Sequence, residues 1–158
     1  SAAPCGECSM RRERGFTLIE LLVVFAIMAL LIGLAPVAFD RMRDSAQYRD
    51  TVRTMLSQMR GARYRAMAEG QEVRFSVNLN QRVYGVDGAP SRALPEALQM
   101  RATVAGIELT GQGEASIRFL PSGGATGGSI EVLRASGAGT RLRVDWLSGR
   151  ATQEALAP

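Results

Sequence analysis

The residues best suited to chemistry in this sequence are one carboxylate and one pair of cysteines. Glu20 stands near the start of a long apolar run, RGFTLIELLVVFAIMALLIGL (14–34). Insertion of an ionised Asp at the centre of a membrane helix costs about 2.5–3.5 kcal/mol, so a carboxylate in such a run usually has a partner and a function. Cys5 and Cys8 form a C-x-x-C pair, which is typical of redox-active dithiols and of half a zinc site.

The two cysteines lack the company that a zinc site needs. A structural zinc ion takes four ligands, usually Cys and His. The sequence holds no His and no Cys beyond Cys5 and Cys8. We therefore expect no metal site and no cofactor. Met10 directly precedes a basic stretch and resembles an initiator, so residues 1–9 are interpreted as lying upstream of the native start.

The apolar run is long enough to cross a bilayer. Residues 21–39 contain no charge, and a helix of this length extends about 28 Å, close to the hydrocarbon thickness of a membrane. A secretory signal peptide has a shorter apolar region of about 7–15 residues, followed by a small-residue cleavage site. That site is not seen here, so we predict that residues 16–39 form the membrane-spanning half of a helix.

A second helical pattern follows directly, in residues 40–70. Apolar residues recur there at spacings of three and four, as on one face of an α-helix: Tyr48, Val52, Met55, Met59, Ala62 and Ala66. Basic helices also occur in calmodulin targets and nucleic-acid binders, but this stripe favours packing on a globular domain. Gly70 is a natural stop. The sequence therefore predicts one helix from about residue 16 to residue 69.

Beyond Gly70 the apolar pattern changes to that of strands. Val73, Phe75 and Val77 alternate with polar residues. Short apolar segments between Gly-rich turns predict seven strands, at 72–78, 82–86, 99–104, 107–109, 115–120, 129–134 and 140–147. The predicted head domain, residues 71–158, is a small antiparallel β-sandwich. The fold class is therefore α+β, with a long N-terminal helix packed on this head.

Charge and composition argue against a nucleic-acid protein and against an enzyme. The net charge is +4, and all 19 basic residues are arginine. Residues 40–71 hold seven Arg against four acids, whereas residues 72–158 hold nine Arg against eight acids, so the head is nearly neutral. After Phe16 the chain has no His and no Cys, and its carboxylates show no paired spacing. We expect no catalytic residues.

The partner of Glu20 depends on the true N-terminus of the working protein. If the chain is cut after Gly15, Phe16 carries a new positive amine, one helical turn from Glu20. The amine of a neighbouring subunit is the best partner for Glu20, because both charges lie in lipid and neutralise each other when helices pack side by side. The alternative is a Glu that is tolerated near the headgroups.

The motif RRERGFTLIELLVVFAIMALLIGLAP closely resembles the leader and N-terminal helix of type IV pilins and type II secretion pseudopilins. The resemblance implies that residues 1–15 contain a leader, that a prepilin peptidase cuts between Gly15 and Phe16 and methylates the new amine, and that Glu20 is the assembly carboxylate. It also implies a single-pass protein of the inner membrane, with its leader in the cytoplasm and its C-terminal domain in the periplasm.

Three later segments resemble the general secretion pathway protein H/FimT branch of minor pseudopilins: LSQMRGARYRAMAEGQEVRFSV, IRFLPSGGATGGSIEV and LRVDWLSGRA. The resemblance implies a type IV pilin-like fold and a minor pseudopilin of the type II secretion system. Its expected partners are other pseudopilins, both major and minor, and the inner-membrane secretion platform. The Gly-rich loop PSGGATGG lacks the G-K-[ST] of a phosphate-binding loop, so we interpret it as a flexible hairpin.

The alternative is a FimT-like minor type IV pilin for pilus biogenesis or DNA uptake. The DNA-binding members of that sub-branch carry a tail that resembles Gly-Arg-x-Arg. The corresponding residues of this chain are Gly149-Arg150-Ala151-Thr152, so the second Arg is missing. Arg141, Arg143 and Arg150 remain candidates for a modest partner-binding patch, although arginines at alternating strand positions usually form a solvated face. Nucleic acid is therefore not an expected partner.

Overall fold

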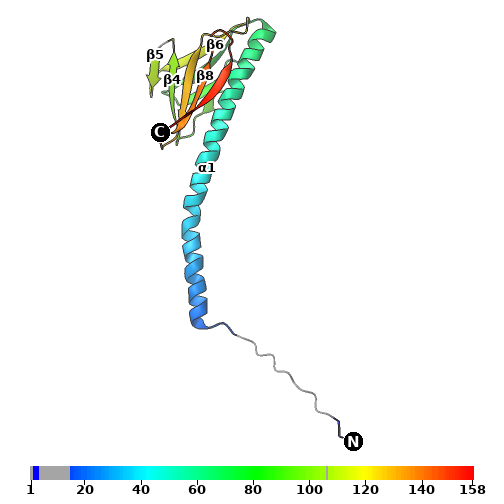
Figure 1. Ribbon diagram of the computed structural model, residues 1–158, viewed down its shortest axis with the longest axis vertical. Helices are drawn as coiled ribbons and strands as arrows, with labels where there is room; N and C mark the ends of the chain where they lie inside the picture. Colours follow the sequence, from blue (N-terminus) through cyan, green and yellow to red (C-terminus); the bar gives the residue numbers. More distant parts are fainter. Residues whose placement is uncertain (1, 4–14, 106) are drawn as a thin grey trace. The chain divides into compact units, whose positions relative to one another are not determined.

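The computed structural model describes residues 2–3, 15–105 and 107–158, and the side chains of residues 107–110 lie outside this description. Cys5, Cys8 and most of the predicted leader are also outside the described residues. The chain divides into two compact units, residues 1–41 and residues 42–158, and each is treated by itself below. The helix α1 (Leu18–Glu69) contributes to both units (Figure 1).

The ends of α1 follow local chemistry. Thr17 precedes the first helical residue and Gly70 follows the last one. Gly70 has a φ of 66°, a left-handed conformation that glycine adopts without steric cost and that commonly ends helices. The helix therefore starts two residues later than the sequence predicts and ends where predicted. Pro36 lies inside it.

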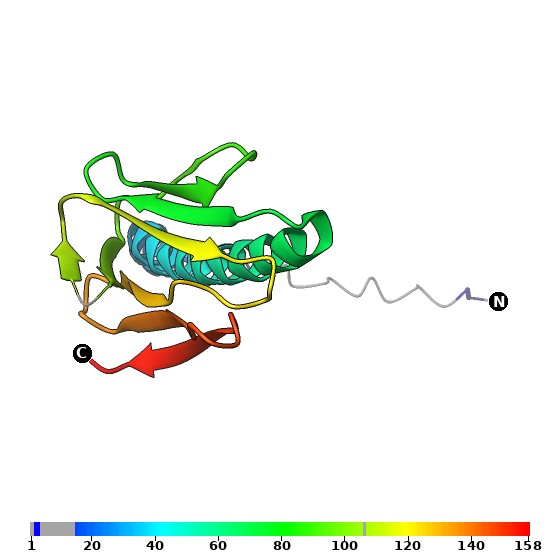
Figure 2. The ribbon, with the colours of Figure 1, turned by 90° about the horizontal axis from the view of Figure 1, so that it is seen from above.

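Two antiparallel sheets make up the rest of the second unit (Figure 2). One has the strand order β3 (Arg92–Ala93), β2 (Val83–Val86), β1 (Val73–Asn78) and β6 (Glu114–Phe119). The other has the order β5 (Ile107–Thr110), β4 (Gln99–Val104), β7 (Gly128–Leu133), β8 (Gly139–Val144) and β9 (Ala151–Leu156).

The core of the second unit lies between α1 and the inward faces of both sheets. The helical residues predicted to pack are buried: Val52, Met55, Met59, Ala62 and Ala66, which we call the helical stripe. Strand residues of both sheets join them in one cluster, among them Phe75, Phe119 and Leu142. Tyr48 is partly buried, and its hydroxyl hydrogen-bonds to the hydroxyl of Thr140. The predicted amphipathic face is therefore confirmed.

Seven predicted strands are present within one or a few residues, and two further strands were not predicted. The strand β3 lies in a segment that the sequence analysis leaves as a loop. The strand β9 pairs with β8 along its whole length, from Ala151 opposite Val144 to Leu156 opposite Gly139. The C-terminal tail is thus a strand at the edge of the larger sheet.

Candidate assembly and partner-binding sites

The first turn of α1 is capped by Thr17. Its Oγ1 accepts a hydrogen bond from the backbone N–H of Glu20 at 3.3 Å, and its carbonyl oxygen accepts one from Leu21 N at 3.1 Å. Ser or Thr at the N-cap followed three residues later by Glu is the sequence of a capping box. Glu20 therefore lies in the first turn of the helix, where a negative charge is favoured by the helix dipole.

Among the described residues of unit 1, no side chain is buried, so its apolar side chains are uncovered. The helix contains an 18-residue window with a mean hydropathy of 2.8, and none of this window is buried. Phe16 is 82% exposed and Leu18 is 84% exposed. By length and composition this helix is able to cross a membrane. Gly15 and Phe16 precede it in irregular backbone, and Glu20 is exposed close behind them.

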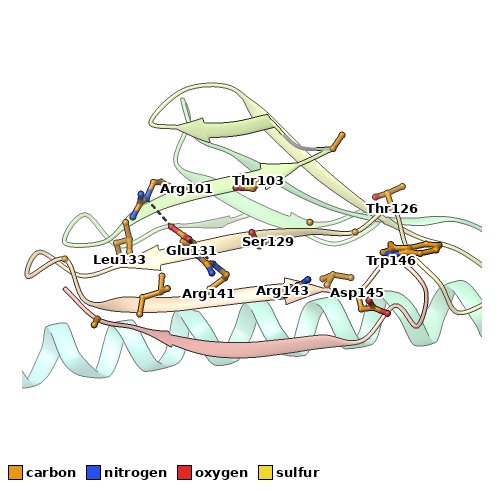
Figure 3. Close-up of a pocket in the computed structure, with 17 residues that line it drawn as sticks. Arg101, Thr103, Thr126, Ser129, Glu131, Leu133, Arg141, Arg143, Asp145 and Trp146 are labelled. Carbon is orange, nitrogen blue, oxygen red and sulfur yellow. Dashed lines mark hydrogen bonds and ion pairs between the residues drawn. The ribbon is translucent and has the colours of Figure 1, made fainter.

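The outer face of the larger sheet carries a row of alternating charges across four strands, and Figure 3 shows three of them, Arg101, Glu131 and Arg141. Arg101, Glu131, Arg141 and Glu154 lie opposite one another in the strand register. The Glu131 carboxylate accepts bonds from Arg141 Nη2 at 2.7 Å and from Arg141 Nε at 3.0 Å. Arg101 Nε lies 3.2 Å from the same carboxylate. The hydrogen bond and charge of Glu131 raise the pKa of Arg141.

Arg143 lies two positions further along β8 and has different surroundings. Its register partners are Ser129 on β7 and Thr152 on β9. Within the described part of the chain, no carboxylate lies within ion-pair distance of Arg143. Arg141 and Arg143 both line a hollow of about 750 Å³ on the outer face of the larger sheet. The structure thus brings Arg141 and Arg143 together on one face, yet Arg141 is committed to two glutamates and Arg143 is not.

Arg150 lies in the turn between β8 and β9, where its carbonyl oxygen accepts a hydrogen bond from Asp145 N at 3.0 Å. Asp145 Oδ2 organises this turn by accepting bonds from the backbone N and the Oγ of Ser148, both at 2.8 Å. These two bonds, first the backbone one, hold the pKa of the Asp145 carboxyl below its usual value of 3.8. The Arg150 side chain is exposed. Of the three predicted arginines, Arg141 and Arg143 thus lie on β8 and Arg150 lies in the turn that follows it.

The structure adds a site that the sequence analysis missed, at the end of the head where α1 finishes. Arg63 Nε donates to the carbonyl oxygens of Gly123 at 2.9 Å and of Ser148 at 3.0 Å. A Cβ atom at Gly149 would overlap the carbonyl oxygen of Gly123. One side chain on the helix thus holds two loops that are far apart in the sequence. Gly123 and Gly149 are visible in the sequence, but only the fold shows that they lie against each other.

The loop of residues 121–128 is more enclosed than the predicted flexible hairpin. Gly123, Gly124 and Ala125 are buried. Ala125 N donates to the carbonyl oxygen of Trp146 at 2.9 Å, and Leu120 N donates to that of Gly124 at 2.9 Å. The glycines serve close packing between loops, which explains their number without a phosphate-binding role.

An apolar N-terminal helix whose second half packs on antiparallel sheets, after a basic segment that ends in glycine, defines a type IV pilin-like protein. Comparison with known proteins agrees with this class and adds a family. Residues 10–36 match the Prokaryotic N-terminal methylation motif. Residues 51–149 match the family Type II transport protein GspH.

Relatives agree with these matches. The chain is 34% identical over 139 residues to the Type II secretion system protein H of Xanthomonas campestris pv. campestris, covering 88% of this chain and 82% of the relative. Two structures of the minor pseudopilin EpsH of Vibrio cholerae have the same fold. One has a TM-score of 0.53 at 15% identity over 71% of this chain and 98% of EpsH. The other has a TM-score of 0.55 at 14% identity, covering 72% and 95%.

The chain belongs to the GspH family of type II transport proteins. It is a minor pseudopilin of the type II secretion system, as the resemblance in its sequence implies. The family is one of structural proteins that work with other components of the secretion system. The main hypothesis from the sequence is therefore confirmed at the level of family and system.

Proposed function

We propose that this protein is held in the inner membrane by residues 16–39 and displays residues 71–158 in the periplasm, where it joins a pseudopilus that drives protein secretion across the outer membrane. The observation that carries the proposal is the presence of both matches in one chain, the methylation motif at 10–36 and the GspH family at 51–149. The fully exposed apolar helix of unit 1 supports it, because such a surface needs lipid or other helices around it.

The proposed assembly step uses Gly15, Phe16 and Glu20. A prepilin peptidase cuts after Gly15, and the new amine of Phe16 becomes a positive charge close to a membrane. Glu20 lies in the first helical turn, exposed and without an ion pair among the described residues. Its carboxylate pairs with the Phe16 amine of a neighbouring pseudopilin, which removes two charges from lipid at once.

The proposed work of the head is binding and not catalysis. Its partners are sibling pseudopilins, major and minor, the secretion platform or secreted cargo. The structure gives little support to the alternative of DNA capture, because phosphate binding needs several free cations together. Arg141 is occupied by Glu131 and Glu154, and the Asp145 carboxylate interacts electrostatically with Arg143.

A clean deletion in the source bacterium tests the proposed function with two readouts at once. We expect exoprotein to disappear from the medium while uptake of external DNA is unchanged, and the wild-type gene to restore secretion. Lost uptake with intact secretion would move the protein to the DNA-capturing pilus branch. Protein-sequencing of the processed chain checks the cut separately, since a mature N-terminus other than Phe16 overturns the assembly step.

A further inference from the structure

The outer face of the larger sheet holds a second row of side chains beside the charged one. Thr103, Ser129 and Arg143 lie opposite one another in the register of β4, β7 and β8, and all three line the hollow of about 750 Å³. We call these three residues the polar row. Figure 3 shows the polar row between Glu131, with its ion pairs, and the side chain of Trp146.

The polar row has hydrogen-bonding groups that the protein itself does not use. Among the described residues, the hydroxyls of Thr103 and Ser129 and the guanidinium of Arg143 make no hydrogen bond to another group of the chain. A hydroxyl both donates and accepts, whereas a guanidinium only donates. The charged row differs, because Arg141 is already engaged by Glu131. The polar row is therefore the part of the hollow that is ready to bind a ligand.

Trp146 stands at the end of the same hollow. It lines the hollow together with Asp145, and its side chain is 66% exposed, although tryptophan is highly buried on average. Its Cβ atom lies 3.1 Å from the position of a Cβ atom at Gly127, and its carbonyl oxygen accepts a hydrogen bond from Ala125 N at 2.9 Å. The backbone of Trp146 is thus held against the neighbouring loop while most of the side chain is bare.

The charges around the hollow do not select an anion. Glu131 pairs with Arg101 and with Arg141. Asp145 interacts electrostatically with Arg143. Each described arginine that lines the hollow therefore has a carboxylate in its surroundings, whereas phosphate and polyanion sites need several cations that are free to neutralise the ligand. An uncharged ligand loses nothing to these carboxylates.

The floor of the hollow does not suit an apolar ligand either. Apolar groups laid over Thr103, Ser129 and Arg143 would leave their polar atoms without partners, at a cost of about 1–3 kcal/mol for each group. The occupant must exchange hydrogen bonds with the polar row and also offer an apolar surface to the indole ring of Trp146. A sugar ring does both, because its C–H groups form an apolar face that stacks on an aromatic ring and its hydroxyls donate and accept around the edge.

We propose that Trp146 and the polar row bind an uncharged oligosaccharide. One pyranose ring stacks on the indole of Trp146, and neighbouring rings lie over the polar row, where Arg143 donates hydrogen bonds to sugar hydroxyls. The polar row crosses three strands, a distance of about 10 Å, so the site has room for several sugar rings. The inference goes beyond the proposed function and does not rest on it, because it uses no residue of the assembly step.

The fluorescence of Trp146 tests this proposal directly, because the chain has no other tryptophan. The full chain is purified in a detergent without a sugar headgroup and titrated with three uncharged tetrasaccharides: cellotetraose, maltotetraose and N-acetylchitotetraose. We expect at least one of them to shift the emission of Trp146 with a Kd of about 1 mM or lower. Sodium phosphate and oligogalacturonate serve as anionic probes and should cause no shift.

Substitutions in the polar row check that the sugar lies there. Arg143→Met should raise the Kd at least about tenfold and Ser129→Ala about threefold, since each removes hydrogen bonds to the ligand and leaves the indole in place. Arg92→Met is the control, because Arg92 is exposed on β3 in the smaller sheet, and it should bind as the wild type does. Trp146→Ala, followed by saturation-transfer NMR of the sugar, should lose binding, whereas Trp146→Phe should keep part of it.

Each other outcome overturns the proposal. It fails if none of the three tetrasaccharides shifts the emission up to about 10 mM, if the anionic probes shift it equally, or if Arg143→Met leaves the Kd unchanged. An emission that responds to protein concentration and not to sugar would assign the hollow to a second copy of the chain, and the proposal would fail in that case too.

Discussion

The backbone of Gly149 lies so close to the carbonyl oxygen of Gly123 that a Cβ atom at Gly149 would overlap this oxygen. The two glycines belong to different loops, one before β7 and one before β9. Gly149 also has a φ of 66°, in the left-handed region. Both the space and the conformation therefore demand glycine at position 149.

Gly149→Ala should lower the free energy of unfolding by about 2–5 kcal/mol. A left-handed non-glycine residue costs about 1–2 kcal/mol, and an extra methyl group in a tightly packed place costs about 1–3 kcal/mol. Denaturant unfolding of the detergent-purified full chain, followed by circular dichroism, measures the change. A loss below about 0.5 kcal/mol would mean that the two loops move apart easily.

Gly61→Ala is the matched control, because it makes the same substitution at a position with open space around the added Cβ atom. It lies in the interior of α1, and nothing is within 4 Å of the position of its Cβ atom. Alanine is favoured over glycine in a helix by about 1 kcal/mol, so this variant should be more stable than the wild type in the same unfolding experiment. Destabilisation here would show that the added methyl group meets an unseen neighbour.

Arg63→Met should release both loops from the helix. Methionine keeps much of the side-chain stem but removes the Nε donor that serves Gly123 and Ser148. Loss of hydrogen bonds from a charged donor should cost about 1.5–3 kcal/mol. Hydrogen exchange should also become faster at the amides of Gly123 and Gly149, which bond within their own loops.

Arg60→Met provides the comparison for that variant, since Arg60 is exposed on the same helix and makes no hydrogen bond among the described residues. Its effect on stability should stay within about 0.5 kcal/mol. Equal effects of the two substitutions would show that charge on the helix, and not the clamp by Arg63, determines stability.

Asp145→Asn should change how stability depends on pH. The folded pKa of Asp145 lies below 3.8 because Ser148 donates two hydrogen bonds to the charged form. The charged carboxylate therefore stabilises the fold above the unfolded pKa, and this contribution is lost as the pH falls through the folded pKa. The stability difference between wild type and variant should be full near pH 7 and shrink below about pH 4. A difference that is constant from pH 7 to pH 3 would contradict this account.

Glu20→Ala should insert into the membrane and be processed normally but assemble poorly. The substitution removes the proposed partner of a neighbouring Phe16 amine, which then stays an unpaired charge in lipid. Co-purification of the variant with the other pseudopilins should fall at least about tenfold. Membrane fractionation and the size shift on processing serve as internal controls. Incorporation at the wild-type level would sink the charge-pairing hypothesis.

Much of the fold was predictable because its signals are local. The apolar stripe of α1 and the alternation in β1 follow from side-chain periodicity alone. The strand β9 has no such signal, since four of its six residues are exposed and none is β-branched except Thr152. The sandwich class was predicted, but the assignment of each strand to one of the two sheets was beyond reach. It depends on β1 pairing with β6, about forty residues later, with Val73 opposite Phe119.

The candidate sites show the same limit. Glu20 could be recognised from the sequence alone, because a carboxylate in an apolar run is unusual and needs an explanation. The difference between Arg141 and Arg143 was invisible, because it follows from which residues the register places opposite them, Glu131 for one and Ser129 for the other. Trp146 and Leu147 gave no sequence signal either, since only the fold shows that the alternating pattern of β8 ends at Val144 and leaves both exposed.

The helical stripe has a consequence for how the protein is made. Synthesis delivers α1 first, yet Tyr48 meets Thr140 only after 92 further residues have followed. Contacts between residues so distant form late. A nascent chain that ends before β8 therefore carries bare Met55 and Met59 on a finished helix. Such an incomplete chain is a natural client for a chaperone and a natural target for quality-control proteolysis.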